Sequence, residues 1–140
     1  MKKILIAEDE EIPLKVLKDR FDSEGWDVTP ATDGEAAIKA VDKNKEFDLI
    51  LLDIVMPKKD GFEVLKHIKS LPEFEEVPII VLSNLGADDD IKKALSLGAN
   101  DYFVKTQHPV GEIIEKANAF SVEGHKPKSD ESYSKEKEKK

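Results

Sequence analysis

The stretch that decides the fold is Phe47-Asp48-Leu49-Ile50-Leu51-Leu52-Asp53. Its apolar run, Leu49 to Leu52, is typical of a strand that is buried on both faces of a parallel sheet. The run ends abruptly in Asp53, and a charge at the rim of a packed core costs on the order of several kcal/mol unless something compensates it. Asp53 therefore either caps the next turn or has a chemical role.

Segments with helical periodicity separate this stretch from four other short apolar runs. These runs occupy residues 4–7, 26–30, 77–82 and 101–104. Strands that alternate with helices in this way pair in parallel and carry helices on both faces of the sheet. Because crossover connections are right-handed, five such units are expected to form a doubly wound, flavodoxin-like α/β sheet with strand order 2-1-3-4-5.

Local signals predict where several elements begin and end. The first helix is expected to begin near Pro13 and to end at Gly25. The apolar face of this helix carries Ile12, Val16, Leu17 and Phe21. Pro30 lacks a backbone N–H, which indicates that the second strand lies at an edge of the sheet. Asp60 is predicted to cap the third helix.

Composition narrows the class of protein. The chain of 140 residues has no cysteine, which excludes disulfides and thiolate metal sites and fits a cytoplasmic location. A net charge of −8 argues against direct binding of nucleic acid, since phosphate backbones attract basic faces. No apolar run approaches the length of about 20 residues that a membrane span needs, and acidic residues 8–11 interrupt what otherwise begins like a signal peptide.

The composition changes at Ser121. Residues 121–140 are mostly Lys, Glu and Ser with almost nothing to bury, which predicts a disordered charged tail after a folded domain of residues 1–120. A tail this short cannot build an output domain. We therefore expect the chain to act by binding another protein, unless it is part of a longer chain.

Polar residues follow four of the predicted strands. They are Glu8 and Asp9, Asp53, Ser83 and Lys105. In an open parallel sheet, ligands bind at the carboxyl ends of the strands, near the point where the winding reverses. Each residue alone is more typical of a loop, a turn or the surface. Their common position at one edge of one sheet favours a functional site instead.

The residue types at this edge predict phosphoryl transfer. Three carboxylates close together repel one another, and a hard cation removes that repulsion. Ligands that are all oxygen suit Mg²⁺, which together with Lys105 would make a strongly positive pocket. Such a pocket stabilises the charge on a transferred phosphoryl group. Asp53 is then the expected nucleophile, which forms an acyl phosphate, and Ser83 is expected to hydrogen-bond a phosphoryl oxygen.

Five motifs occur in a characteristic order along the chain. They are residues 4–9, residues 53–57 with Asp60-Gly61, and residues 81–83, 98–102 and 104–105. Together they resemble the receiver domain of two-component response regulators, of the stand-alone chemotaxis-regulator type, over about residues 2–120. The resemblance implies that Asp53 accepts a phosphoryl group from a histidine kinase or a phosphotransfer protein. It also implies a signalling switch and not an enzyme.

The resemblance implies a role for several further residues. Mg²⁺ would be held by Asp9, Asp53 and the Val55 carbonyl, with Glu8 acting through water. The residues that match the family's switch pair are Ser83 and Tyr102. The fourth helix, fifth strand and fifth helix would form the face that binds a downstream target protein. The protein is expected to be a monomer or a weak homodimer that pairs through the same face.

Three positions depart from the family pattern. Glu8 replaces the commoner Asp, and Asn84 follows Ser83 where a small residue is usual. Thr106 follows Lys105 in place of the usual Pro, and a cis bond before a residue other than proline costs about 2.5–4 kcal/mol, so this loop is either trans and rearranged or strained. These departures leave open the alternative of a pseudo-receiver, an interaction module that is not phosphorylated. A flavin carrier on the same sheet is disfavoured, because acidic residues 8–11 would repel the flavin phosphate.

Overall fold

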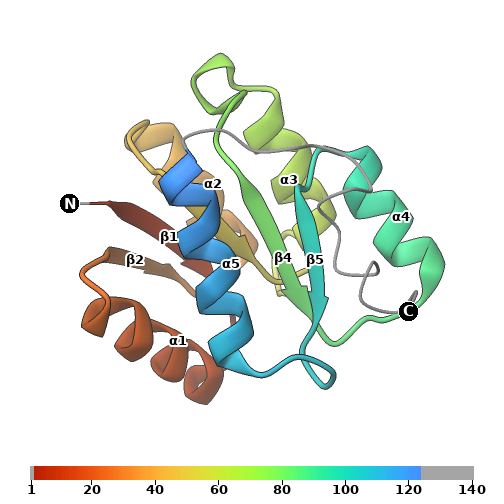
Figure 1. Ribbon diagram of the computed structural model, residues 1–140. Coiled ribbons are helices and arrows are strands. Elements are labelled where there is room, and N and C mark those ends of the chain that lie inside the picture. Colours follow the sequence, from red (N-terminus) through yellow and green to blue (C-terminus); the bar gives the residue numbers. More distant parts are fainter. Residues whose placement is uncertain (1, 124–140) are drawn as a thin grey trace.

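Residues 2–123, which the computed structural model of the protein describes, form one sheet of five parallel strands in the order β2-β1-β3-β4-β5 (Figure 1). The strands are β1 (Lys3–Ala7), β2 (Asp27–Ala31), β3 (Leu49–Leu52), β4 (Ile79–Ser83) and β5 (Asp101–Val104). The helices in the same part of the chain are α1 (Glu11–Ser23), α2 (Gly34–Lys43), α3 (Gly61–Lys69), the short 3₁₀ helix η1 (Pro72–Phe74), α4 (Asp88–Ser96) and α5 (Val110–Glu123). The predicted doubly wound fold is confirmed.

The side chains of the strands alternate between two apolar cores, one on each face of the sheet. In β1, Ile4 and Ile6 belong to the core under α1 and α5. Leu5 and Ala7 belong to the core under α2, α3 and α4. All of β3 is buried in the same alternating way, which explains why its apolar run is unbroken. Figure 1 shows α5 lying across the near side of the strands.

The predicted edge strand and the limits of α1 are confirmed. Pro30 lies in β2 at the edge of the sheet, opposite Ile6 of β1. Pro13 lies in the first turn of α1, where its missing N–H leaves no helical hydrogen bond unmade. Gly25 follows the helix with a φ of +92°, a left-handed conformation that glycine adopts without strain.

The predicted apolar face of α1 is wrong for its first turns. Leu17 and Phe21 are buried, but Ile12 and Val16 are 76% and 42% exposed. Both line an apolar groove of about 250 Å³ between α1 and the start of α5, and nothing within residues 2–123 fills it. These side chains therefore face the groove and solvent and not the core.

Close packing holds the loop that follows β3. A methyl group on Gly61 would lie 2.5 Å from the Ile54 Cα atom and would overlap the Asp53 carbonyl group. A methyl group on Gly34 would overlap backbone atoms of the same loop. Asp60 caps α3 as predicted, because its Oδ1 accepts a backbone hydrogen bond at 3.0 Å. The backbone that leaves Asp53 is therefore fixed by contacts that only small residues allow.

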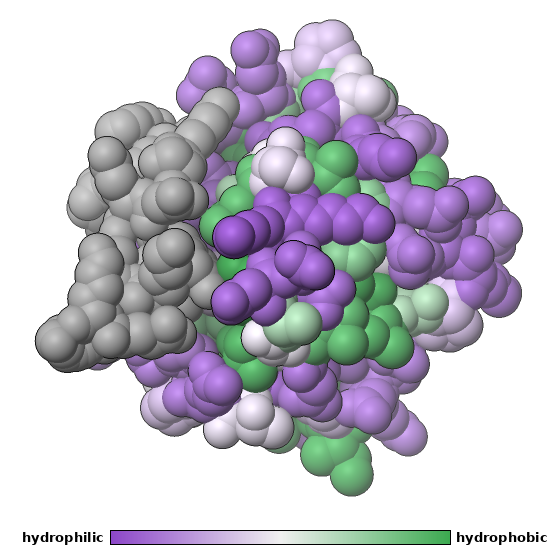
Figure 2. Space-filling view, turned by 90° about the vertical axis from the view of Figure 1, so that its right-hand side faces the viewer, coloured by the Kyte–Doolittle hydropathy of each residue, from purple (hydrophilic) through white to green (hydrophobic). Residues whose placement is uncertain are grey.

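α5 continues to Glu123, beyond the predicted domain end at residue 120. The rest of the predicted tail, residues 124–140, lies outside the described residues. Within residues 2–123, no helix has both the length and the apolar character to cross a membrane. Seen from the α4 side, the surface is largely hydrophilic, with smaller hydrophobic areas between the polar side chains (Figure 2).

Candidate functional site

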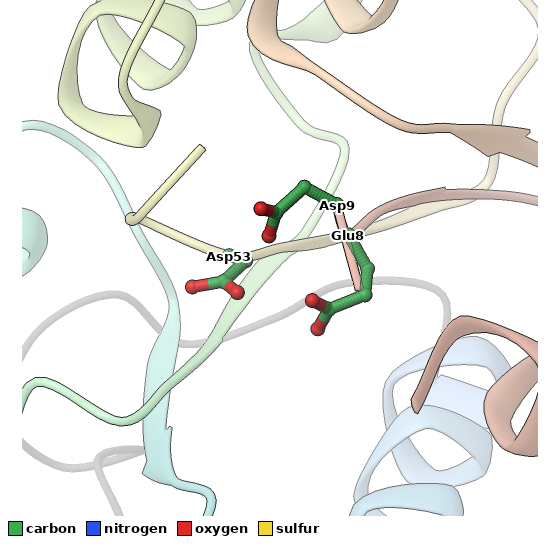
Figure 3. A group of neighbouring side chains, drawn as sticks. All are labelled: Glu8, Asp9 and Asp53. Atoms are coloured by element: carbon green, nitrogen blue, oxygen red, sulfur yellow. The ribbon is translucent and has the colours of Figure 1, made fainter. Parts of the chain in front are cut away.

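Glu8, Asp9 and Asp53, which we call the acidic cluster, meet because β1 and β3 are paired. Ala7 lies opposite Leu52 in the parallel register, so the residues that follow these two emerge at the same edge of the sheet. The Asp53 N–H donates to the Ala7 carbonyl at 3.0 Å, which extends the pairing to the site itself. Carboxylate oxygens of the three side chains lie within 4.8 Å of one another (Figure 3).

Lys105 joins the acidic cluster from the end of β5. Its Nζ donates to Glu8 Oε1 at 2.5 Å and to Asp53 Oδ2 at 3.2 Å. No peptide bond within residues 2–123 is cis, so the bond between Lys105 and Thr106 is trans. Of the two arrangements that the sequence left open for this loop, the trans arrangement is the one present. The ammonium group reaches both carboxylates from it.

The cluster carries more negative charge than Lys105 offsets. The side chains of Glu8 and Asp53 are 2% and 7% exposed. Burial raises the pKa of the Glu8 carboxyl and the charge of Asp53 adds to this, while the hydrogen bonds from Lys105 and the Glu10 N–H oppose it without cancelling it. Burial alone would lower the pKa of Lys105, but its hydrogen bond to Glu8 and the two carboxylate charges raise it. Both groups therefore hold their protons more tightly than usual.

The acidic cluster could hold a metal ion. All its donors are carboxylate oxygens, the ligands that hard cations such as Mg²⁺ prefer. The residues that line the adjoining pocket of about 140 Å³ are Asp9, Glu10, Asp53, Val55, Asn84 and Lys105. Val55 is 54% exposed at this rim. Burial, together with the Asp53 charge, raises the Glu8 pKa and so disfavours an uncompensated carboxylate here. A divalent cation would compensate this charge, so the residues present fit such an ion.

Sequence reasoning missed the part that Glu10 plays. Its backbone N–H donates to Glu8 Oε2 at 3.1 Å, and the residue also lines the pocket. Its side chain is exposed, and no sequence pattern separates a loop N–H that faces a buried carboxylate from one that faces water. Asn84, noted in the sequence as larger than usual, is exposed and borders the same pocket.

Ser83 and Tyr102 both contact Leu85, in the loop between β4 and α4. The Leu85 N–H donates to Ser83 Oγ at 3.3 Å, and the Tyr102 hydroxyl donates to the Leu85 carbonyl at 2.7 Å. Ser83 is fully buried and Tyr102 is 1% exposed, so the tyrosine ring points inward. The Lys105 N–H donates to the Ser83 carbonyl at 2.8 Å, so the serine and the lysine are held together by the pairing of β4 and β5.

Lys105 also lines the apolar groove between α1 and α5. The side chains of Ile12, Pro13, Val16, Leu82, Val110 and Ile113 line the groove with it. His108 completes this wall, and its Nδ1 lies 3.0 Å from Glu112 Oε1. The helical spacing of Ile12 and Val16 was the sequence signal of this groove. The same spacing is typical of a buried helix face, so it predicted that both residues belong to the core. His67 lies away from the site and pairs with Asp42 at 2.7 Å.

Comparisons with known proteins agree with this geometry. The model of the response regulator receiver domain family matches residues 4–118. The transcriptional regulatory protein CpxR of Klebsiella pneumoniae is 39% identical over 125 residues, which cover 89% of this chain and 51% of CpxR. The alkaline phosphatase synthesis transcriptional regulatory protein PhoP of Bacillus subtilis is 39% identical over 108 residues, which cover 77% of this chain and 44% of PhoP.

Solved structures show the same fold. The receiver domain of the Francisella response regulator 1452 has a TM-score of 0.80 at 29% identity, over 89% of this chain and 99% of that domain. A chain of the CheX-CheY-BeF3-Mg complex from Borrelia burgdorferi has a TM-score of 0.74 at 32% identity, over 86% of this chain and 88% of its own. This chain spans about half the length of the curated relatives that it matches. Since the family model covers most of the chain and the site geometry agrees with it, the chain belongs to the response regulator receiver domain family.

Proposed function

We propose that the protein is a phosphorylatable receiver in which Asp53 accepts a phosphoryl group from a phosphohistidine of a histidine kinase or a phosphotransfer protein. A carboxylate oxygen of Asp53 attacks phosphorus and an acyl phosphate forms. The bond from phosphorus to the imidazole nitrogen breaks, and that nitrogen keeps the electron pair. The observation that supports this most is the position of Asp53, buried at the end of β3, inside the acidic cluster and 3.2 Å from the Lys105 ammonium.

Mg²⁺ is the proposed cofactor, since the acidic cluster offers only hard oxygen ligands. Asp9, Asp53 and the Val55 carbonyl would hold the ion, with Glu8 acting through water. When bound, the ion supplies positive charge beside the transferred group. Lys105 would hold one phosphoryl oxygen, and the hydrogen bond from its Nζ to the acceptor carboxylate supports this role. In this role Lys105 exchanges its carboxylate partners for the phosphoryl group.

The proposed switch connects Ser83 to Tyr102 through Leu85. Ser83 Oγ accepts from the Leu85 N–H and the Tyr102 hydroxyl donates to the Leu85 carbonyl, so both side chains hold one peptide segment. A Ser83 hydroxyl that turns to the phosphoryl group gives up the Leu85 N–H. The segment before α4 then moves and alters the face of α4, β5 and α5. We propose that this face controls a downstream target protein and is also where a weak homodimer would form.

The groove between α1 and α5 is the proposed docking surface for the phosphoryl donor. Exposed Ile12 and Val16 lie on one side of the groove, and Lys105 links it to the acidic pocket. An apolar helix face of the donor protein would cover these side chains. A histidine on that helix would then face Asp53. The composition is consistent with a cytoplasmic site of action, and we propose that location and a domain that ends near residue 120.

Incubation with acetyl phosphate and Mg²⁺ tests the proposed function. Intact-protein mass spectrometry should detect one added phosphoryl group on the wild type and none on Asp53→Asn. Asp89→Asn, which changes an exposed carboxylate on α4, is the matched control and should be modified like the wild type. A wild type that stays unmodified would instead support the pseudo-receiver, the alternative that Asn84 and Thr106 motivate.

A further inference from the structure

We propose that His108 is the positioning residue that holds Lys105 toward the acidic cluster in this chain, an inference that rests on the proposed function of Lys105. The family pattern has a proline after this lysine, and here Thr106 follows it through a trans bond. Lys105 nevertheless reaches Glu8 and Asp53. Something other than a proline directly after Lys105 must therefore keep residues 105–108 in place.

The first contact of His108 ties the loop to α5. Its Nδ1 lies 3.0 Å from Glu112 Oε1, one helical turn along the chain. The side chain of His108 is 13% exposed and that of Glu112 is 26% exposed, so the pair is largely sheltered from solvent. This contact fixes where the loop enters α5.

The second contact ties the loop back to the sheet. The His108 ring packs edge-on against the ring of Phe103, with ring centroids 4.9 Å apart and an interplanar angle of 77°. Phe103 is fully buried in β5, two positions before Lys105. His108 therefore joins the strand before the loop to the helix after it, and the short segment that carries Lys105 is closed between these two contacts.

Backbone hydrogen bonds narrow the path of the loop further. The Lys105 N–H donates to the Ser83 carbonyl at 2.8 Å, and the Gln107 N–H donates to the Val104 carbonyl at 2.9 Å. Thr106 and Gln107 are exposed at the tip of this turn, whereas His108 and Lys105 line the same groove. The imidazole and the lysine thus belong to the lining of one groove.

Two roles of His108, positioning of Lys105 and simple support of α5, predict different results when the histidine is removed. If His108 holds Lys105, its loss frees the ammonium group from Glu8 and Asp53 and leaves the rest of α5 unchanged. If His108 only supports α5, its loss loosens the whole helix. Lys116, which pairs with Asp101 from the middle of α5, reports the second case.

Reductive methylation of the metal-free protein, read by peptide mass spectrometry, tests the proposal without any phosphorylation. His108→Ala should raise the labelling rate of Lys105 at least threefold relative to the wild type and leave that of Lys116 unchanged. Gln107→Ala, a change at an exposed side chain of the same loop, should alter neither rate. An unchanged Lys105 rate, or a parallel increase at Lys116, would overturn the proposal.

Two conservative variants resolve the contributions of the two contacts. His108→Gln keeps an amide that can reach Glu112, and His108→Phe keeps a ring against Phe103. Each should recover part of the Lys105 protection that His108→Ala loses. Recovery by neither would count against the two contacts as the cause.

Phosphorylation by acetyl phosphate supplies a second readout. In the wild-type background, His108→Ala should slow the modification of Asp53 severalfold. In a protein that already carries Lys105→Met, it should cause no further slowing, because the histidine acts through the lysine. Equal slowing in both backgrounds would show a general structural role and overturn the proposal. If the wild type is not phosphorylated at all, the proposed function fails, and the labelling result still decides whether His108 positions Lys105.

Discussion

The loop after β3 and the loop after β5 each bring a charged side chain to the acidic cluster, but different forces hold them. Backbone packing fixes the first: Gly61 lies against Ile54, the Gly61 N–H donates to the Ile54 carbonyl at 2.7 Å, and Asp60 caps α3. Side chains fix the second, through His108 and its contacts with Phe103 and Glu112. Residue size therefore limits which substitutions the loop after β3 tolerates, and side-chain chemistry limits which substitutions the loop after β5 tolerates.

This difference suits the proposed function. As the proposed acceptor, Asp53 would stay in one place while a metal ion and a phosphoryl group come and go, and a backbone in van der Waals contact on several sides does not adjust. Lys105 would exchange its carboxylate partners for a phosphoryl oxygen. A lysine on a loop held by side-chain contacts can make that exchange without moving the sheet.

The largest expected effect follows from crowding the first loop. Gly61→Ala would place a methyl group 2.5 Å from the Ile54 Cα atom, among backbone atoms that cannot move aside independently. We expect the free energy of unfolding to fall by about 3 kcal/mol. Urea denaturation measures this. Gly86→Ala is the control, since its methyl group would lie 3.5 Å from the nearest atoms and should change stability by less than about 0.5 kcal/mol. Equal effects would show that the first loop is not fixed by packing.

The contrast also explains what could be predicted from the sequence. The fold followed from apolar runs and turn residues, and so did the convergence of Glu8, Asp9 and Asp53, because strand register alone brings strand ends together. Asp60 capping α3 follows in the same way from local chemistry. These features depend on spacing along the chain, which a sequence displays directly.

Features that depend on side chains from distant elements could not be predicted. Ile12 and Val16 are exposed because they line the open groove between α1 and α5, whereas helical spacing alone assigned both to the core. The position of the Lys105 ammonium depends on His108 meeting Phe103 across a turn. No pattern in the sequence around His108 reveals the partners of this histidine.

The second prediction concerns the competition between Lys105 and Mg²⁺ for the same carboxylates. Lys105→Met leaves Glu8 and Asp53 without their cation, so the metal-free protein should lose about 1 kcal/mol of stability, a modest figure because solvent screens part of the interaction. Mg²⁺ should then raise the melting temperature more in this variant than in the wild type. Calorimetry with and without Mg²⁺ measures both. An equal Mg²⁺ shift in the two proteins would contradict competition.

The third prediction concerns the loss of the negative charge of Asp53. Asp53→Asn relieves repulsion within the acidic cluster, so the metal-free variant should be more stable than the wild type by about 1 kcal/mol, and its affinity for Mg²⁺ should fall. Glu115→Gln, at an exposed position on α5, is the control for a lost carboxylate charge and should change stability little. Chemical denaturation and Mg²⁺ titration by melting shift measure the two effects. A less stable Asp53→Asn would mean that Lys105 already offsets the repulsion.

The smallest effect concerns Glu8 and depends on pH. Because the folded pKa of Glu8 is raised above its ordinary value of 4.5, the folded protein holds this proton more tightly than the unfolded chain does. The contribution of Glu8 to stability therefore declines as pH rises from 4.5 through the raised folded pKa, and it stays low above that. Glu8→Gln removes this decline. In metal-free buffer, the free energy of unfolding of the variant relative to that of the wild type should therefore increase as pH rises across this window.

Urea denaturation at a series of pH values measures the difference between the two proteins. Glu115→Gln, an exposed change on α5, serves as the control for a general effect of lost charge. Addition of Mg²⁺ should make the wild type the more stable of the two proteins at neutral pH, because it keeps the carboxylate that we propose to bind the ion through water. A difference that is constant with pH would show that Lys105 compensates Glu8 fully. The loop after β5 would then be held to the acidic cluster by charge as firmly as packing holds the loop after β3.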